Sequence, residues 1–156
     1  LREPASRRRD FTLVNAPDLT AELMRQVGGE PWRMQLGASV AVQLAGLERV
    51  PLASLAGKRL VAAAGIGNPA RFFATLRSAG LEFAEMPLPD HHDFLDQPFA
   101  HLDADVILIT EKDAVKCRQL EHLNNDLRLW VVPVSAQIDA ALANQIVEKC
   151  RGRPTA

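Results

Sequence analysis

The stretch RLVAAAGIGNPARFFATLRSAG, residues 59–80, reads as a strand, a tight turn and a helix in immediate succession. Its first six residues form a short apolar run of the kind found in buried strands. Asn68 is a good N-cap, Pro69 suits the first helical position, and Gly80 is a natural stop. The stretch therefore predicts one strand–helix unit of an α/β fold.

The same alternation continues towards the end of the chain. Further strands are expected at 81–86, 105–109 and 129–134, helices at 110–120 and 138–150, and a short helix or structured loop at 94–102. Thr110 and Asp113 stand in a capping-box-like pattern at the start of one helix. Strands that alternate with helices imply parallel pairing with right-handed crossovers. Residues 57–156 are thus predicted to form an α/β domain: a three-layer, mostly parallel sheet with flanking helices.

The first fifty-six residues are less regular. Residues 11–15 suit a strand, and residues 19–27 suit a short helix that ends at two glycines. The loose alternation of apolar residues over 34–47 favours antiparallel strands. Residues 1–56 are therefore predicted to be a linker with a small β element that precedes the α/β domain.

Composition excludes several classes of protein. Apolar residues make up 47% of the 156 residues, charged residues 24%, and the formal net charge is -1, which argues against nucleic acid as the main partner. The basic run Arg7-Arg8-Arg9 is an exception, either a solvated edge or an anchor for phosphates or anionic lipid. No apolar run approaches the roughly eighteen residues that span a bilayer.

Two further features concern the context of the chain. Cys117 and Cys150 match no metal spacing and suggest no disulfide framework, so a reducing cytosol is expected. There is no pattern of a signal peptide, and the chain starts at Leu1, which we interpret as the start of a fragment or of one domain of a larger protein.

The densest group of reactive side chains is Asp90-His91-His92-Asp93, which follows a predicted strand. Three interpretations stay open. Imidazole and carboxylate suit divalent metals, although adjacent side chains rarely bind one ion together. Asp90 and His91 also suit a proton-transfer pair in which the carboxylate fixes the tautomer of the ring. The third interpretation is structural: the polar residues cap the following segment.

Two other turns lie at predicted strand ends. The glycine turn at 65–69 precedes a helix, so its amides suit a phosphate, but it lacks the pattern of a P-loop or a dinucleotide fingerprint. A tight structural turn explains it equally. Lys112, in the first turn of the next helix, suits an anionic substrate group, and a solvated helix start is the alternative.

Three strings taken together resemble one family: AGIGNPARFFATLRSAGL at 64–81, PLPDHHDF at 87–94 and ILITEKDAVKC at 107–117. In order and spacing they are similar to the C-terminal half of tetraacyldisaccharide 4'-kinase, the lipid A 4'-kinase of Gram-negative bacteria. The opening residues, Leu-Arg-Glu-Pro at 1–4, are similar to an element of the same family. The resemblance covers essentially the whole chain.

This resemblance implies a P-loop kinase-like architecture and transfer of the ATP γ-phosphate to the 4'-hydroxyl of tetraacyldisaccharide 1-phosphate. It places Asp90 and His91 at the active site, with His91 supporting the catalytic base. Arg2 and Glu3 would line the cleft near nucleotide and metal, and Lys112 and His92 are possible substrate contacts.

The resemblance also implies cofactors and partners. ATP and Mg²⁺ would be held mainly by an N-terminal P-loop domain, and no metal ligand is assigned within this chain. The substrate's acyl chains imply a peripheral enzyme at the cytoplasmic face of the bacterial inner membrane. Arg7-Arg8-Arg9 would contact the surface of that membrane. No nucleic acid partner is implied.

The chain contains no Gly-x-x-x-x-Gly-Lys-Ser/Thr string, so we expect the isolated chain to lack kinase activity. Two alternative functions remain. A metal-dependent phosphoesterase would use Asp90, His91 and His92 but needs upstream ligands, and residues 1–89 contain no histidine. A non-catalytic α/β binding or remnant domain is the other.

Overall fold

A computed structural model of the protein describes residues 9–46 and 48–152. Contacts between residues divide the chain into two compact units. One unit holds residues up to 36 together with those from 136 onward, and the other holds residues 37–135. Each unit has its own sheet.

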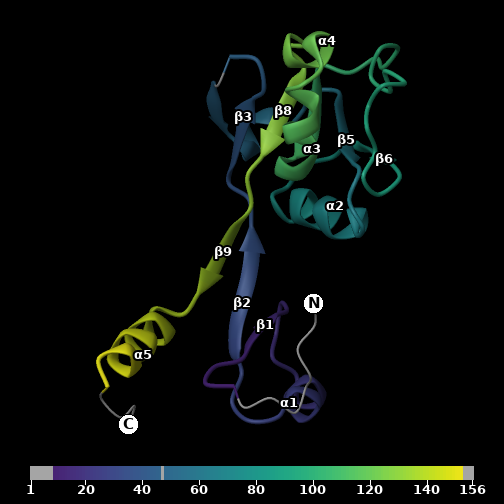
Figure 1. The fold of residues 1–156 in the computed structure, drawn as a ribbon. Helices are drawn as coiled ribbons and strands as arrows, with labels where there is room; N and C mark the ends of the chain where they lie inside the picture. Colours follow the sequence, from purple (N-terminus) through teal and green to yellow (C-terminus); the bar gives the residue numbers. More distant parts are fainter. Residues whose placement is uncertain (1–8, 47, 153–156) are drawn as a thin grey trace. The chain divides into compact units, whose positions relative to one another are not determined.

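The larger unit is built on a six-stranded sheet with the strand order β4-β3-β8-β7-β5-β6 (Figure 1). The strands are β3 (Val40–Gln43), β4 (Arg49–Pro51), β5 (Leu60–Ala64), β6 (Ala84–Pro87), β7 (Val106–Thr110) and β8 (Leu129–Val132). β6, β5, β7 and β8 run parallel, whereas β3 is antiparallel to both β8 and β4. The predicted, mostly parallel sheet is confirmed.

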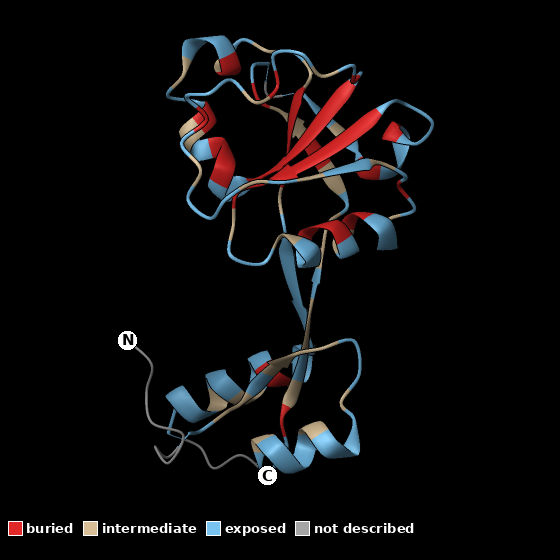
Figure 2. Cartoon of the chain, turned by 90° about the vertical axis from the view of Figure 1, so that its right-hand side faces the viewer, coloured by how far each residue is buried: buried red, intermediate tan, exposed pale blue. Residues whose placement is uncertain are grey.

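Alternate residues of the central strands face opposite sides of this sheet, and each side has its own core. On one side the strands pack against α2 (Pro69–Ser78) and the 3₁₀ helix η1 (Leu52–Leu55). On the other they pack against α3 (Glu111–Cys117), α4 (Glu121–Asn124) and the loop before β7. Figure 2 shows the buried strands in red between these helices. The unit therefore has the three layers expected from the sequence.

The connections create a topological switch point between β5 and β7. From β5 the chain passes through α2 to β6 on one side, and then returns to β7 on the other side of β5. The connections after neighbouring strands thus diverge at the carboxyl ends of β5 and β7. In open α/β sheets a crevice at such a point is where ligands bind.

The smaller unit contains a three-stranded sheet in the order β1-β2-β9. Its elements are β1 (Leu13–Asn15), α1 (Ala21–Val27), β2 (Trp32–Gly37), β9 (Ser135–Ile138) and α5 (Ala140–Cys150). β1 runs parallel to β2, and the side chains of Thr20 and Asp139 cap the two helices. Among the residues described in this unit, only Pro31 and Leu142 are buried.

This division differs from the predicted boundary after residue 56. β3 and β4 do not precede the α/β domain but extend its sheet, because β3 pairs with β8. At the other end, β8 stops at Val132 because Pro133 cannot donate a ladder hydrogen bond. β9 then joins the sheet of β2, and α5 follows in the same unit.

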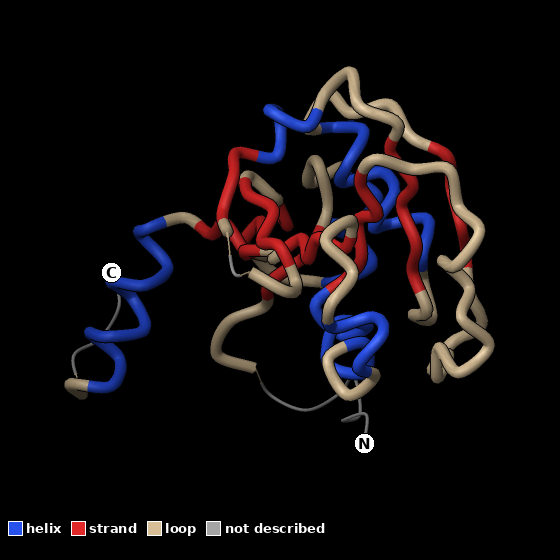
Figure 3. Tube along the Cα trace, turned by 90° about the horizontal axis from the view of Figure 1, so that it is seen from above, coloured by secondary structure: helices blue, strands red, loops and turns tan. Residues whose placement is uncertain are grey.

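Two local differences also concern the larger unit. β6 begins at Ala84 rather than at residue 81, since the amide of Leu81 donates to the carbonyl of Leu76 and closes the end of α2. The helix predicted at 110–120 is the shorter α3, which ends at Cys117, and α4 follows it from Glu121. For residues 94–102 the structure has the second of the two predicted alternatives, a loop, which consists of turns; loops are tan in Figure 3. No helix in the part of the chain that the structure describes is long and apolar enough to cross a membrane.

Candidate functional site

The segment after β6 folds over the carboxyl end of β5. The amide of Leu88 donates to the carbonyl of Ala64 at 3.0 Å, and the amide of His91 donates to the carbonyl of Gly65 at 3.2 Å. These two bonds continue the pairing of β5 with β6 beyond the sheet. They bring the Asp-His-His-Asp sequence to the switch point.

His91 takes a backbone conformation that few residues other than glycine adopt. Its φ is 62°, in the left-handed region, which costs about 1–2 kcal/mol for a residue with a Cβ. The same amide that bonds to Gly65 also donates to Oδ1 of Asp90 at 3.0 Å. The side chain of His91 is 73% exposed, so this turn presents the imidazole to solvent.

Asp90 connects this turn to the first turn of α3. Its Oδ1 accepts a hydrogen bond from Nζ of Lys112 at 3.2 Å, and both side chains are about half exposed. The hydrogen bond from Lys112 lowers the pKa of Asp90, and the charge of a protonated His91 adds to the effect. The carboxylate thus stays ionised beside the histidine.

The imidazole of His91 lies near Asp90 without a hydrogen bond to it. Its Nε2 is 3.7 Å from Oδ2 of Asp90. That distance exceeds a hydrogen bond. The structure therefore brings together Asp90, His91 and Lys112, three of the residues predicted from the sequence.

His92 points into its own loop. Its side chain is only 10% exposed, Nδ1 accepts a hydrogen bond from the amide of Phe94 at 2.9 Å, and Nε2 is 3.4 Å from Oδ2 of Asp96. Its ring also packs on the ring of Phe94 with 4.9 Å between centroids. These contacts hold the loop in shape, and the substrate contact suggested for His92 stays a prediction.

Asp113 was expected only as part of a capping box, and the structure gives it a different partner. Thr110 Oγ1 accepts from the amide of Asp113 at 3.2 Å, as in a cap. The carboxylate does not reach back to Thr110's own amide. Instead Oδ2 accepts from the amide of Gly65 at 3.1 Å and from the Thr110 hydroxyl at 2.6 Å. Asp113 thereby joins α3 to the turn after β5.

Gly65 is required by this close approach. A Cβ at this position would lie 3.0 Å from Oδ1 of Asp113, 3.1 Å from Cβ of His92 and 3.4 Å from the carbonyl oxygen of Pro89. The turn after β5 is therefore packed on two sides. Nothing in the sequence pattern of the turn distinguished this role from that of an ordinary glycine turn.

A metal centre was one interpretation of the histidine-rich turn. Within the described residues, the group whose ligand atoms lie within 4.8 Å of one another is His92, Asp93 and Asp96, and not Asp90 with the two histidines. Nδ1 of His92 and Oδ1 of Asp93 already accept amide hydrogen bonds from the same loop. The loop's own hydrogen bonds thus account for the cluster.

Mg²⁺ is implied by the family resemblance, and the described residues do not fit it. The ion prefers six oxygen ligands and keeps several waters. Asp90 is engaged by Lys112, and the oxygen of Asp113 that has no hydrogen-bond partner among the described residues is buried. No step of the reaction is therefore assigned to a metal on these residues.

Two other groups of candidate residues lie away from this site. Arg2, Glu3, Arg7 and Arg8 lie outside the described residues. The thiol of Cys117 is buried on α3, and burial and the charge of Asp113 raise its pKa to about 12, so it is no nucleophile.

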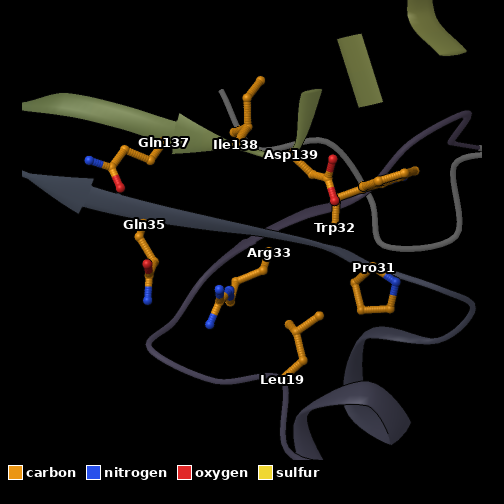
Figure 4. A pocket seen from close by; sticks show the side chains of 8 residues that line it. All are labelled: Leu19, Pro31, Trp32, Arg33, Gln35, Gln137, Ile138 and Asp139. Carbon is orange, nitrogen blue, oxygen red and sulfur yellow. The ribbon is translucent and has the colours of Figure 1, made fainter. Parts of the chain in front are cut away.

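The smaller unit contains a cavity of about 460 Å³ (Figure 4). It is lined by Leu19, Pro31, Trp32, Arg33, Gln35, Gln137, Ile138 and Asp139. Arg33, which points towards it, donates to the carbonyl of Pro17 at 2.9 Å. None of the residues predicted from the sequence to form a site lines this cavity.

Comparison with known proteins identifies relatives over the whole chain. The family model described as LpxK, tetraacyldisaccharide-1-P 4'-kinase, matches residues 1–151. A tetraacyldisaccharide 4'-kinase of Janthinobacterium sp. (strain Marseille) is 59% identical, and one of Herminiimonas arsenicoxydans is 55% identical. Each alignment covers 100% of this chain but 46% and 47% of the relative. The chain thus spans about half the length of these curated relatives.

A solved structure supports the fold. The crystal structure of LpxK from Aquifex aeolicus in complex with ATP matches 79% of this chain and 37% of that protein, with a TM-score of 0.56 and 22% sequence identity. At that identity the likeness concerns the fold alone. Together with the sequence matches, it confirms the resemblance carried by the three strings and the α/β architecture.

Proposed function

Since the chain belongs to the tetraacyldisaccharide 4'-kinase family, we propose that it forms the C-terminal half of a lipid A 4'-kinase. The proposed enzyme transfers the γ-phosphate of ATP to the 4'-position of tetraacyldisaccharide 1-phosphate. One observation carries the assignment of the site. A carboxylate, an imidazole and an ammonium group, from Asp90, His91 and Lys112, meet at the switch point of the sheet.

These groups suit one side of a phosphoryl-transfer cleft. Phosphoryl transfer depends mainly on positioning and on charge stabilisation. The exposed ring of His91 can support the base that takes the proton of the 4'-hydroxyl, while Asp90, 3.7 Å away, stabilises the protonated ring. Lys112 adds a positive charge that can meet an anionic group of the substrate.

We assign the rest of the cleft to a P-loop half in the part of the relatives' length that this chain does not span. That half would bind ATP and Mg²⁺, and Arg2 and Glu3 would line the same cleft. The acylated substrate places the enzyme at the cytoplasmic face of the inner membrane. Arg7-Arg8-Arg9 would contact anionic lipid there.

The test uses the complete kinase that contains this chain. We expect His91→Ala and Asp90→Asn to lower kcat by about 10²–10⁴-fold, the usual contribution of general acid–base groups. The thermal midpoint should stay close to that of the wild type, because both side chains are exposed. His101→Ala, which removes another exposed histidine of the same unit, is the matched control and should leave kcat unchanged.

A second experiment tests whether kinase activity requires both halves of the protein. The chain of residues 1–156 alone should show no ATP-dependent phosphorylation of the lipid disaccharide, and adding the P-loop half should restore it. Wild-type kcat in His91→Ala would overturn the assignment of the site. Activity of the isolated chain would overturn the requirement for a second half.

A further inference from the structure

Asp113 is a buried carboxylate whose surroundings are unusual for a charged group. The residue is 1% exposed, and its Oδ1 has no hydrogen-bond partner among the described residues. No Lys, Arg or His within the described residues forms an ion pair with it at 4.0 Å or less. A buried polar oxygen that lacks a hydrogen-bond partner destabilises the fold. A side chain kept at such a cost needs an explanation beyond packing.

Helix capping does not supply that explanation. The start of α3 is already capped by Thr110, whose hydroxyl oxygen accepts from the amide of Asp113. That bond uses the backbone of Asp113 and would exist with many other side chains. The carboxylate accepts from the hydroxyl of Thr110 and from the amide of Gly65, which lies 48 residues away in sequence. The second bond joins α3 to the turn of the site.

Gly65 connects Asp113 to the turn that carries His91. Its amide donates to Oδ2 of Asp113 at 3.1 Å, and its carbonyl accepts from the amide of His91 at 3.2 Å. The carbonyl bond is one of two that hold His91 at its left-handed φ of 62°. A shift of Gly65 would therefore move the backbone of His91 and the direction of its exposed ring.

Two neighbouring residues in the first turn of α3 contact the two loops of the site. Lys112 bonds directly to Asp90, and the next residue, Asp113, bonds to Gly65. The first turn of α3 thus fixes both neighbouring loops, one through an exposed ion pair and one through a buried carboxylate. Only the buried one is shielded from water and able to hold a loop rigidly.

We propose that Asp113 is a positioning residue of the phosphoryl-transfer site: through Gly65 it sets the backbone of His91 and aims the imidazole into the cleft. The inference rests on the proposed function, because it gives Asp113 a role in a reaction that His91 serves. Asp113 does not touch substrate, since the residue is 1% exposed and its carboxylate is held by the amide of Gly65 and the hydroxyl of Thr110.

The experiment compares three variants in the complete kinase. Asp113→Ala removes both hydrogen bonds and should lower kcat by about 10²-fold, the cost of a displacement of about 1 Å in a reacting group. KM for ATP and for the lipid should change by less than about threefold, because binding groups are untouched. Asp113→Asn keeps an oxygen that can accept from both Gly65 and Thr110, and it should restore most of the lost kcat.

Cys117→Ala is the matched control. It removes a fully buried side chain from the same helix, one turn further on, that belongs to the apolar core on that side of the sheet. It should lower the thermal midpoint but leave kcat unchanged. Amide hydrogen exchange at Gly65 and His91 should accelerate in Asp113→Ala and not in Cys117→Ala.

A double-mutant cycle distinguishes the positioning role of Asp113 from the proposed role of His91 in the reaction. If Asp113 acts through His91, then Asp113→Ala should cost little further kcat in a protein that already carries His91→Ala. A full additional loss in that background, or kcat unchanged in Asp113→Ala alone, overturns the positioning role. No loss in His91→Ala alone overturns the proposed function instead. Should Asp113→Ala fail to fold, Thr110→Val, which removes one donor to the carboxylate, enters the same cycle with the same outcomes.

Discussion

At the scale of single residues, the two glycines of the turn after β5 have different surroundings. A Cβ on Gly65 would meet Asp113, His92 and the backbone of Pro89 at 3.0–3.4 Å. A Cβ on Gly67 would lie 3.5 Å from the nearest atom, Oδ2 of Asp90, which is ordinary van der Waals contact. Neither has a positive φ, so the contrast comes from packing and not from backbone strain.

This contrast predicts opposite effects for two similar substitutions. Gly65→Ala should lower the free energy of unfolding by about 1–3 kcal/mol, because the new methyl group displaces atoms that backbone bonds hold in place. Gly67→Ala should leave it unchanged or raise it by up to about 1 kcal/mol, since alanine narrows the unfolded ensemble. Urea unfolding of the two variants decides between them. Equal free energies of unfolding for the two variants would show that the turn accommodates a methyl group at residue 65 without destabilising the fold.

At the scale of elements, the sequence predicts well where local signals decide. Asn68 and Pro69 start α2 as expected, and the apolar runs at β5 and β7 are fully buried strands. At 94–102 local signals could not decide between a short helix and a structured loop, because a distant group holds the loop that forms. Arg128 donates to the carbonyls of Phe99 and Leu102 from 29 and 26 residues away.

The amino ends of β5 and β7 are joined by an ion pair with a pH dependence. Arg59 donates to both carboxylate oxygens of Asp105 through its side chain and its backbone amide, which lowers the pKa of Asp105 to about 2 from 3.8. A carboxyl whose pKa is lower in the folded state stabilises the fold above its ordinary pKa. That contribution is fully present above pH 3.8 and is lost as the pH falls through about 2.

Asp105→Asn should therefore reduce stability near neutral pH and have little effect near pH 2. The free energy of unfolding, measured by urea titration across that range, should converge for wild type and variant at the acidic end. Asp103→Asn is the control, since Asp103 also pairs with Arg59 but is much more exposed. A constant difference between wild type and Asp105→Asn at every pH would contradict the ion-pair origin.

At the scale of the whole molecule, part of the site follows from topology. Asp90 and Lys112 are 22 residues apart, and predicting that each follows a parallel strand was enough to expect them at one edge of the sheet. The role of Asp113 was not accessible in the same way. Its pattern with Thr110 indicates a capping box, and only the three-dimensional position of Gly65 shows why the carboxylate turns away.

The division into units leads to a prediction about folding. Every member of the two buried clusters lies between residues 41 and 132, so a polypeptide of residues 37–135 contains both cores of the larger sheet. We expect it to unfold cooperatively in urea, with the secondary structure content of an α/β domain. The smaller unit contributes few buried residues and should exchange its amide hydrogens faster in the full chain.

A polypeptide of residues 57–156, the domain first expected from the sequence, is the matched control of similar length. It lacks β3, β4 and the buried residues Leu52 and Leu55. β8 would become an open edge strand, because Trp130 and Val131 would lose their pairing with β3, and an open edge favours aggregation. In exchange it gains β9 and α5, whose one buried residue among those described is Leu142. A cooperative transition for 57–156 and none for 37–135 would contradict the assignment of β3 and β4 to the larger unit. It would mean that these strands, which precede residue 57, are dispensable for the sheet they extend.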